Sequence, residues 1–144
     1  MHTAGVRVFI GCSDSRFEDL KKLVDATAGV YETFYFQSPG GGLCLANKAD
    51  PSGVGILDGL SFLAKNKKIV EIYLSSHEDC LFFKKRILEE NEIFLNNLKS
   101  YDEFRMHELL LEISAQRIRR IIPNASIYLA QIQILKISSY SPQN

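Results

Sequence analysis

The sequence lacks any apolar run close to the roughly 20 residues that a membrane-spanning helix needs. It also lacks a charge excess, because 17 lysine and arginine residues balance 17 aspartate and glutamate residues. Proteins that bind nucleic acid or anionic membranes usually carry a basic excess. The first residues are typical of a strand rather than of a signal peptide. We therefore expect a cytoplasmic protein that binds neither nucleic acid nor membrane.

Cysteine is scarce: the three residues are Cys12, Cys44 and Cys80, and no two of them form the Cys-x-x-Cys pair of redox proteins. Cysteines in the cytoplasm stay reduced, so a pair that meets in the fold indicates a metal site rather than a disulfide. The interval between Cys12 and Arg16 is too short for the phosphate-binding loop of cysteine phosphatases. The sequence therefore favours metal chemistry for Cys12 and Cys80, and we expect Cys44 to be a small packing residue.

A loop of three glycines, Gly40 to Gly42, lacks the features of nucleotide-binding loops. It has neither the Lys-Ser/Thr of a P-loop nor the glycine spacing of a dinucleotide site. Two interpretations remain open. The loop can be a turn that needs positive φ, or its backbone can approach a small ligand, in which case Gly40 and Gly41 bind substrate.

Apolar periodicity predicts strands that alternate with helices along the chain. Such alternation favours an α/β fold, a three-layer α/β/α sandwich in which helices cover both faces of a mainly parallel sheet of about four strands. We expect a single domain over residues 1–144, with tails at 1–5 and 138–144. The expected strands span residues 6–10, 33–37, 69–74 and 127–137, and the expected helices span 17–28, 50–68, 81–98 and 102–122.

Residues that can carry chemistry follow three of these strands. Cys12 comes just after the first strand, the loop with Gly40 after the second, and His77 and Cys80 after the third. In a parallel sheet the carboxyl ends of the strands lie at one edge, where such folds place their functional residues. We therefore expect these segments to meet, although they are far apart in the sequence.

Two thiolates and one imidazole are ligands that zinc prefers, and three ligands leave a fourth position open. We expect Cys12, His77 and Cys80 to hold Zn²⁺, with water or the Asp14 carboxylate in the fourth position. Zinc lowers the pKa of bound water toward about 7 in favourable sites, although two thiolates weaken this effect. Asp14 would then accept a hydrogen bond from the hydroxide, and Arg16 would hold Asp14 in a charge-assisted pair.

Plainer interpretations of the same residues stay open. The two cysteines can be buried packing residues beside a chance histidine, and a zinc ion closed by Asp14 would be purely structural. Asp14 and Arg16 can also form a helix cap and a surface ion pair, which adds little stability. We expect His2 and His107 to be incidental.

Residues 12–16 (Cys-Ser-Asp-Ser-Arg) and 77–80 (His-Glu-Asp-Cys) resemble the two signatures of the β-class carbonic anhydrases, Cys-x-Asp-x-Arg and His-x-x-Cys. The order of the motifs and their positions after strands also match. The resemblance implies that Cys12, His77 and Cys80 are the zinc ligands, and that Asp14 and Arg16 form the catalytic dyad. It further implies reversible hydration of CO₂ to bicarbonate in a homodimer whose active-site cleft lies near the subunit boundary.

The chain departs from the usual pattern of that family beside these motifs. Residues 37–40 read Gln-Ser-Pro-Gly where the family commonly has Arg-Asn-Ala-Gly, and Ser76 and Leu81 stand where glycines usually flank the ligands. Two alternatives to CO₂ hydration therefore stay open. One is a zinc-binding homologue without this activity, and the other is a hydrolase of a related small electrophile such as COS or CS₂. The edges of a small sheet also predict a homodimer or higher homo-oligomer.

Overall fold

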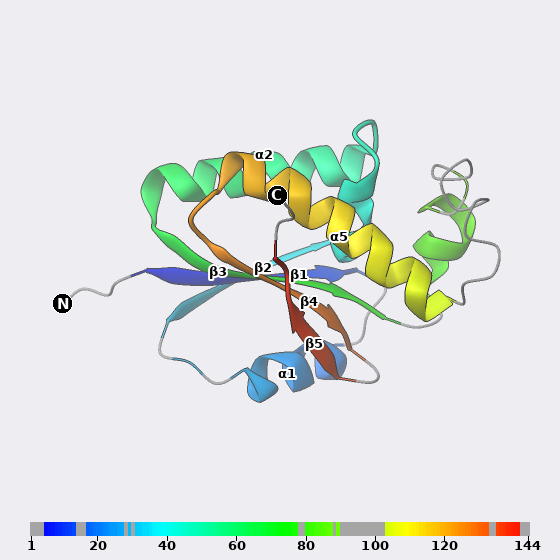
Figure 1. Ribbon diagram of the computed structural model, residues 1–144, viewed down its shortest axis with the longest axis horizontal. Helices are drawn as coiled ribbons and strands as arrows, with labels where there is room; N and C mark the ends of the chain where they lie inside the picture. Colours follow the sequence, from blue (N-terminus) through cyan, green and yellow to red (C-terminus); the bar gives the residue numbers. More distant parts are fainter. Residues whose placement is uncertain are drawn as a thin grey trace.

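The computed structural model describes residues 5–13, 17–27, 29, 31–77, 80–87, 89, 103–132 and 135–141. Its strands are β1 (Val6–Cys12), β2 (Glu32–Ser38), β3 (Ile69–Ser76), β4 (Ser126–Gln131) and β5 (Lys136–Ser139). They form one five-stranded sheet in the order β2-β1-β3-β4-β5 (Figure 1). Strands β1 to β4 run parallel to one another, and β5 pairs antiparallel with β4.

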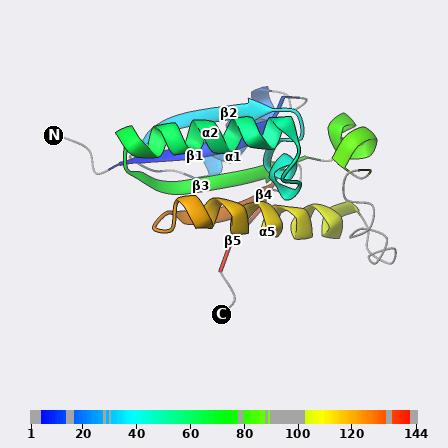
Figure 2. The ribbon, with the colours of Figure 1, turned by 90° about the horizontal axis from the view of Figure 1, so that it is seen from above.

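Helices cover both faces of this sheet. Helix α1 (Phe17–Ala26) lies on one face, and α2 (Pro51–Asn66) and α5 (Glu103–Ile121) lie on the other (Figure 1). Seen from above, α2 and α5 run side by side along the sheet (Figure 2). Two short helical segments, η1 (Gly41–Ala46) and η2 (Phe83–Ile87), follow β2 and β3 in the chain. The structure thus confirms an α/β sandwich with a mainly parallel central sheet.

Strand β1 is buried along its whole length, as expected of a central parallel strand that is covered on both faces. Its side chains alternate between the two layers of core. Val8 and Ile10 pack in the cluster that contains residues of α2 and α5, while Phe9 packs with Leu20 and Leu23 of α1. The strand predicted at residues 6–10 is therefore confirmed, and it continues to Cys12 at the edge of the sheet.

The single strand predicted at residues 127–137 is wrong, because this segment holds two strands, β4 and the start of β5. Leu135, in the connection between them, has a left-handed backbone with φ of 50°. Large apolar residues rarely adopt this conformation, so nothing in the sequence marks the turn. Ser138 and Ser139, assigned above to the C-terminal tail, pair with β4. The sheet consequently has one strand more than expected.

The helices agree with the predictions where they are described. Helices α1 and α5 fall within two of the expected ranges. Helix α2 begins after Asp50, whose carboxylate accepts a hydrogen bond of 2.9 Å from the backbone N–H of Ser52. The helix expected at 81–98 is described only through residue 87 and at residue 89, and within that part it includes the π-helical η2. Among the described residues, no helix has both the length and the apolar character that crossing a membrane requires.

Candidate metal centre

The three predicted metal ligands meet at the carboxyl edge of the sheet. Cys12 is the last residue of β1, and His77 directly follows β3. Because β1 and β3 are adjacent parallel strands, with Ile10 opposite Leu74, their carboxyl ends lie at a similar level. Cys80 directly precedes the helical residues that follow. The parallel pairing of two strands is thus what brings these distant side chains together.

The ligand atoms of Cys12, His77 and Cys80 all lie within 4.8 Å of one another. The two Sγ atoms are 3.5 Å apart. In a tetrahedral site with zinc–sulfur bonds of about 2.3 Å, two sulfur ligands lie roughly 3.8 Å apart. All three side chains are buried, with exposed fractions of 1%, 6% and 1%, and neither cysteine is in a disulfide. The donor atoms and their spacing therefore fit Zn²⁺.

The neighbouring thiol of Cys12 also influences the ionisation of Cys80. The pKa of Cys80 is raised, first by its hydrogen bond with Cys12 and then by burial. Without a cation, burial and the contact with Cys12 therefore disfavour the thiolate form of Cys80. A divalent cation reverses this preference, since a coordinating thiol is deprotonated. Metal binding at this centre would therefore release protons and strengthen as the pH rises.

The glycine loop after β2 packs on the backbone of the ligand strand. Gly41 has a φ of 52°, and a Cβ atom there would lie 2.5 Å from the nitrogen of Cys12 and 2.7 Å from the carbonyl carbon of Gly11. Gly40 has a φ of 87°, and its Cβ would lie 2.7 Å from the side chain of Ile87. Only glycine combines this conformation with such close approach. The structure thus places Gly41 against Cys12, while substrate binding by Gly40 and Gly41 stays a prediction.

Asp14 and Arg16, the predicted catalytic dyad, lie outside the described residues, as does His2. Their roles stay predictions. The described chain continues one residue beyond Cys12, where the backbone N–H of Ser13 donates a hydrogen bond of 3.1 Å to the carbonyl of Ser38. The end of β1 is therefore held beside β2 up to the residue that precedes the dyad.

His107, which we expected to be incidental, is buried near the metal ligands. Its Nδ1 atom lies 3.0 Å from Oγ of Ser76, the residue before His77. Its ring packs edge-on against Phe83, with the ring centroids 4.4 Å apart. Burial, with a smaller contribution from the nearby charge of His77, lowers the pKa of His107 to about 4. The imidazole is therefore neutral at pH 7, which suits a contact with a serine hydroxyl.

The sequence did contain a signal for His107. It belongs to a stripe of α5 residues at helical spacing, all of which are buried. A polar side chain on such a stripe needs a buried hydrogen-bond partner, so its position alone indicated a specific contact. The buried residues of this stripe are His107, Leu110, Leu111, Ser114, Ala115 and Ile118.

Cys44 lies in the core and is not a member of the Cys-His-Cys group. Its exposed fraction is 1%, and its thiol donates to the carbonyl oxygen of Gly41 at 3.1 Å. Burial is the main cause that raises the pKa of Cys44 to about 12. A thiol that keeps its proton and is surrounded by packed residues is unreactive. This environment agrees with the packing role expected for Cys44.

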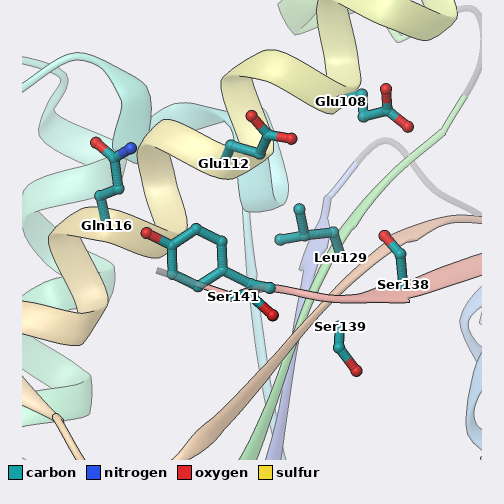
Figure 3. A pocket seen from close by; sticks show the side chains of 8 residues that line it. Glu108, Glu112, Gln116, Leu129, Ser138, Ser139 and Ser141 are labelled. Carbon is teal, nitrogen blue, oxygen red and sulfur yellow. The ribbon is translucent and has the colours of Figure 1, made fainter. Parts of the chain in front are cut away.

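The structure also has a surface pocket that the sequence did not predict. It has a volume of about 340 Å³ and lies between α5 and β5, with Glu108 and Glu112 on one side and Ser138 on the other (Figure 3). None of the metal ligands lines it. The carboxylate of Glu108 is paired with Lys136 at 2.8 Å. The pocket is therefore separate from the metal centre.

Comparisons with known proteins identify the fold. The chain matches no protein-family model and no curated protein sequence. Among solved structures it is similar to the β-carbonic anhydrase CafD of Aspergillus fumigatus, with a TM-score of 0.53 and 16% identity over 96% of this chain and 90% of that chain. It is also similar to a tetrameric β-carbonic anhydrase of Sordaria macrospora, with a TM-score of 0.52 and 14% identity over 98% of this chain and 83% of that one.

A β-carbonic anhydrase of Trichomonas vaginalis is similar to the same degree, with a TM-score of 0.52 and 16% identity over 97% of this chain and 86% of that one. Identities this low establish the fold and leave the activity to be tested. The resemblance that two short motifs indicated is confirmed at the level of the whole architecture. The chain has the fold of the β-carbonic anhydrases, with a Cys-His-Cys group placed to bind a metal ion at the carboxyl edge of its sheet.

Proposed function

We propose that this chain is a zinc-dependent carbonic anhydrase that catalyses the reversible hydration of CO₂ to bicarbonate. The observation that carries the proposal is the convergence of ligand atoms from Cys12, His77 and Cys80 within 4.8 Å. Thiolate and imidazole donors select zinc over magnesium or calcium, which prefer oxygen ligands. When bound, zinc would supply a water acidified enough to add to CO₂ near neutral pH.

The other roles in the proposed reaction fall to residues of the chain. Cys12, His77 and Cys80 would hold the ion, and three protein ligands would leave a fourth position for water. Asp14 would accept a hydrogen bond from the attacking oxygen and orient it, and Arg16 would hold the Asp14 carboxylate in a charge-assisted pair. The loop at Gly40 and Gly41, whose backbone closely approaches the ligand strand, borders the space for CO₂.

Stopped-flow measurement of CO₂ hydration by the zinc-loaded protein tests this proposal. We expect a rate above that of the buffer, and an increase between about pH 7 and pH 9 because the attacking water must lose a proton. Absence of any rate above the buffer at both pH values would reject the proposal.

Cysteine variants provide a matched control for the metal. Cys80→Ser removes a zinc ligand, whereas Cys44→Ser changes a cysteine that is equally buried but lies outside the centre. We expect the first variant to lose zinc and activity, and the second to keep one zinc per chain. Equal zinc content in both variants would show that the Cys-His-Cys group is not the metal site.

The almost complete burial of the three ligand side chains favours a second candidate, a zinc site that stabilises the fold without catalysing CO₂ hydration. Such a site would have its fourth position filled by protein at every pH. X-ray absorption at the zinc edge, recorded at two pH values, separates the candidates: an exchangeable oxygen ligand supports the enzyme, and an unchanging fourth protein ligand supports the structural site. Turnover of COS and CS₂, measured in the same preparations, tests the related hydrolase activity.

We also propose that the chain acts as a homodimer or higher homo-oligomer in the cytoplasm. Strand β2 lies at one edge of the sheet, and such edges usually need cover. A cytoplasmic location would keep Cys12 and Cys80 reduced and able to bind metal. Analytical ultracentrifugation checks the assembly, and a single species near the chain mass of 16.3 kDa at high concentration would contradict it.

A further inference from the structure

Two residues that flank the metal-ligand pair touch the same side chain of α5. Ser76 precedes His77, and its hydroxyl lies 3.0 Å from Nδ1 of His107. Phe83 follows Cys80 by one helical turn, and its ring meets the face or edge of His107 at an interplanar angle of 71°. His107 therefore contacts both ends of the segment that carries His77 and Cys80.

Ser76 is held from two directions. Its carbonyl oxygen accepts a hydrogen bond of 3.0 Å from the backbone N–H of Ile132, just past the end of β4. Its side chain contacts His107 from the layer of helices above the sheet. A residue fixed at both its backbone and its side chain has little freedom to rotate, so the direction in which His77 leaves the strand is defined.

The contact is buried throughout. The exposed fractions of Ser76, Phe83 and His107 are 2%, 2% and 1%. A hydrogen bond in such surroundings competes with no water, and loss of either partner leaves the other unsatisfied. The bond forms in either tautomer of the imidazole, because a serine hydroxyl can both donate and accept. At the other side of the ring, Glu103 Oε1 lies 3.3 Å from Nε2, at ion-pair distance but without the alignment of a hydrogen bond.

We infer that His107 is a positioning residue of the metal centre: by holding Ser76 and Phe83, it fixes the segment between them so that His77 and Cys80 face Cys12. The inference rests on the proposed function only in that it requires the Cys-His-Cys group to bind zinc. Residues outside the ligands that hold ligands in place typically change metal affinity by about 10–100-fold when they are mutated. His107 would affect zinc affinity through its contacts with Ser76 and Phe83 rather than by touching the ion.

A serine, a histidine and a glutamate in a row also resemble a nucleophilic triad, but the geometry excludes this role. A serine nucleophile must face a substrate, whereas Ser76 is 2% exposed and its hydroxyl is directed at a buried ring. The pocket between α5 and β5 and the smaller pocket beside it are lined by neither Ser76 nor His107. The contact is therefore structural support for the neighbouring ligands.

Zinc affinity measured by competition with a chromophoric chelator tests the inference on the full chain. We expect His107→Leu and Ser76→Ala each to weaken zinc binding about 10-fold, since either change removes the same contact. The double variant should bind zinc no more weakly than whichever single variant has the lower affinity, because a shared contact can be lost only once. His107→Asn places an amide near the position of Nδ1 and should restore most of the affinity.

A second readout follows the geometry directly. Cobalt substituted for zinc reports tetrahedral coordination through its visible absorption, and we expect an altered spectrum in Ser76→Ala and His107→Leu but not in His107→Asn. Ser114→Ala is the matched control, because Ser114 is a buried serine on the same face of α5, about two turns further along. This control should keep both the zinc affinity and the cobalt spectrum of the wild type.

The outcomes separate the inference from the proposed function. A wild-type chain that binds no zinc would overturn both. Zinc binding by the wild type, with unchanged affinity and spectrum in Ser76→Ala, would overturn only the role of His107, and this smaller change serves even if His107→Leu does not fold. A loss in His107→Asn as large as that in His107→Leu would also overturn it, because packing alone would then explain the effect.

Discussion

The close contact between Gly41 and the ligand strand gives a prediction whose size follows from the structure. Alanine at this position would have to keep a φ of 52°, which costs an L-residue roughly 1–2 kcal/mol. Its Cβ would also lie 2.5 Å from the nitrogen of Cys12 and 2.9 Å from its Cα. Backbone atoms cannot move aside as a flexible side chain can, and overpacking of this kind costs about 1–3 kcal/mol more. We expect Gly41→Ala to destabilise the protein by about 3 kcal/mol.

Thermal unfolding followed by circular dichroism measures this effect. For a chain of this length, 1 kcal/mol corresponds to about 3 °C, so the melting temperature of Gly41→Ala should fall by roughly 10 °C. Gly55→Ala is the matched control, since Gly55 lies in α2 and a Cβ there would meet nothing within 4 Å. Alanine replaces glycine favourably inside a helix, by about 1 kcal/mol, so this variant should melt about 3 °C higher. A Gly41→Ala protein that melts within about 2 °C of the wild type would refute the packing of this loop on Cys12.

Three further predictions concern the metal, a partly buried ion pair and an acid-sensitive contact. Removing zinc with a chelator should lower the melting temperature by about 10 °C when the free zinc had been a hundred-fold or more above its dissociation constant, and no change would contradict a metal centre built by the fold. Asp50→Ala removes the cap of α2 and the partner of Arg86, whose Nε lies 3.2 Å from the fully buried carboxylate. We expect the free energy of unfolding, measured in urea, to fall by about 3 kcal/mol. The loss should be smaller in Asp50→Asn, which keeps the cap. The pKa of Glu108 is lowered from its ordinary value of 4.5, chiefly by its hydrogen bond with Lys136. This carboxylate therefore stabilises the fold fully above that ordinary value, and the effect is lost as the pH falls through the lower pKa of the folded state. The difference in unfolding free energy between wild type and Glu108→Gln should shrink on acidification, and a difference independent of pH would count against it.

The positions of the three candidate metal ligands were predictable because they follow parallel strands that end at one edge of the sheet. Apolar runs marked β1 and β3, and parallel pairing of two such strands places the residues after them at one edge. Cys12, His77 and Cys80 therefore met as expected. The period of the apolar pattern and the direction of the strands were enough to predict this meeting, without any knowledge of how side chains pack.

The parts that the sequence did not reveal depend on tertiary packing. The turn before β5 contains Leu135 at positive φ, where no glycine or asparagine marks it, so a single strand was predicted through the turn. The 3₁₀ segment η1 is short and starts from glycines, which local propensity assigns to a loop. The helical spacing of α5 indicated that His107 would be buried, but its partner Ser76 could not be predicted because that contact depends on how α5 lies over β3.

The proposed metal centre is contacted by the glycine loop and by α5, and variants of these two contacts should differ in how zinc affects their stability. Gly41 packs on the backbone of Cys12, so a Cβ atom there disturbs the strand itself and should lower stability with or without zinc. Ser76 contacts His107 through its side chain alone. Ser76→Ala should therefore cost the metal-free protein about 1–3 kcal/mol, because it leaves a buried imidazole nitrogen unsatisfied. It should lose more stability when zinc is present, because its affinity for the ion also falls. Melting of both variants, each with zinc and with chelator, checks this contrast. If Ser76→Ala lost the same stability with zinc as with chelator, the contact to His107 would be ordinary core packing and would not direct the ligands.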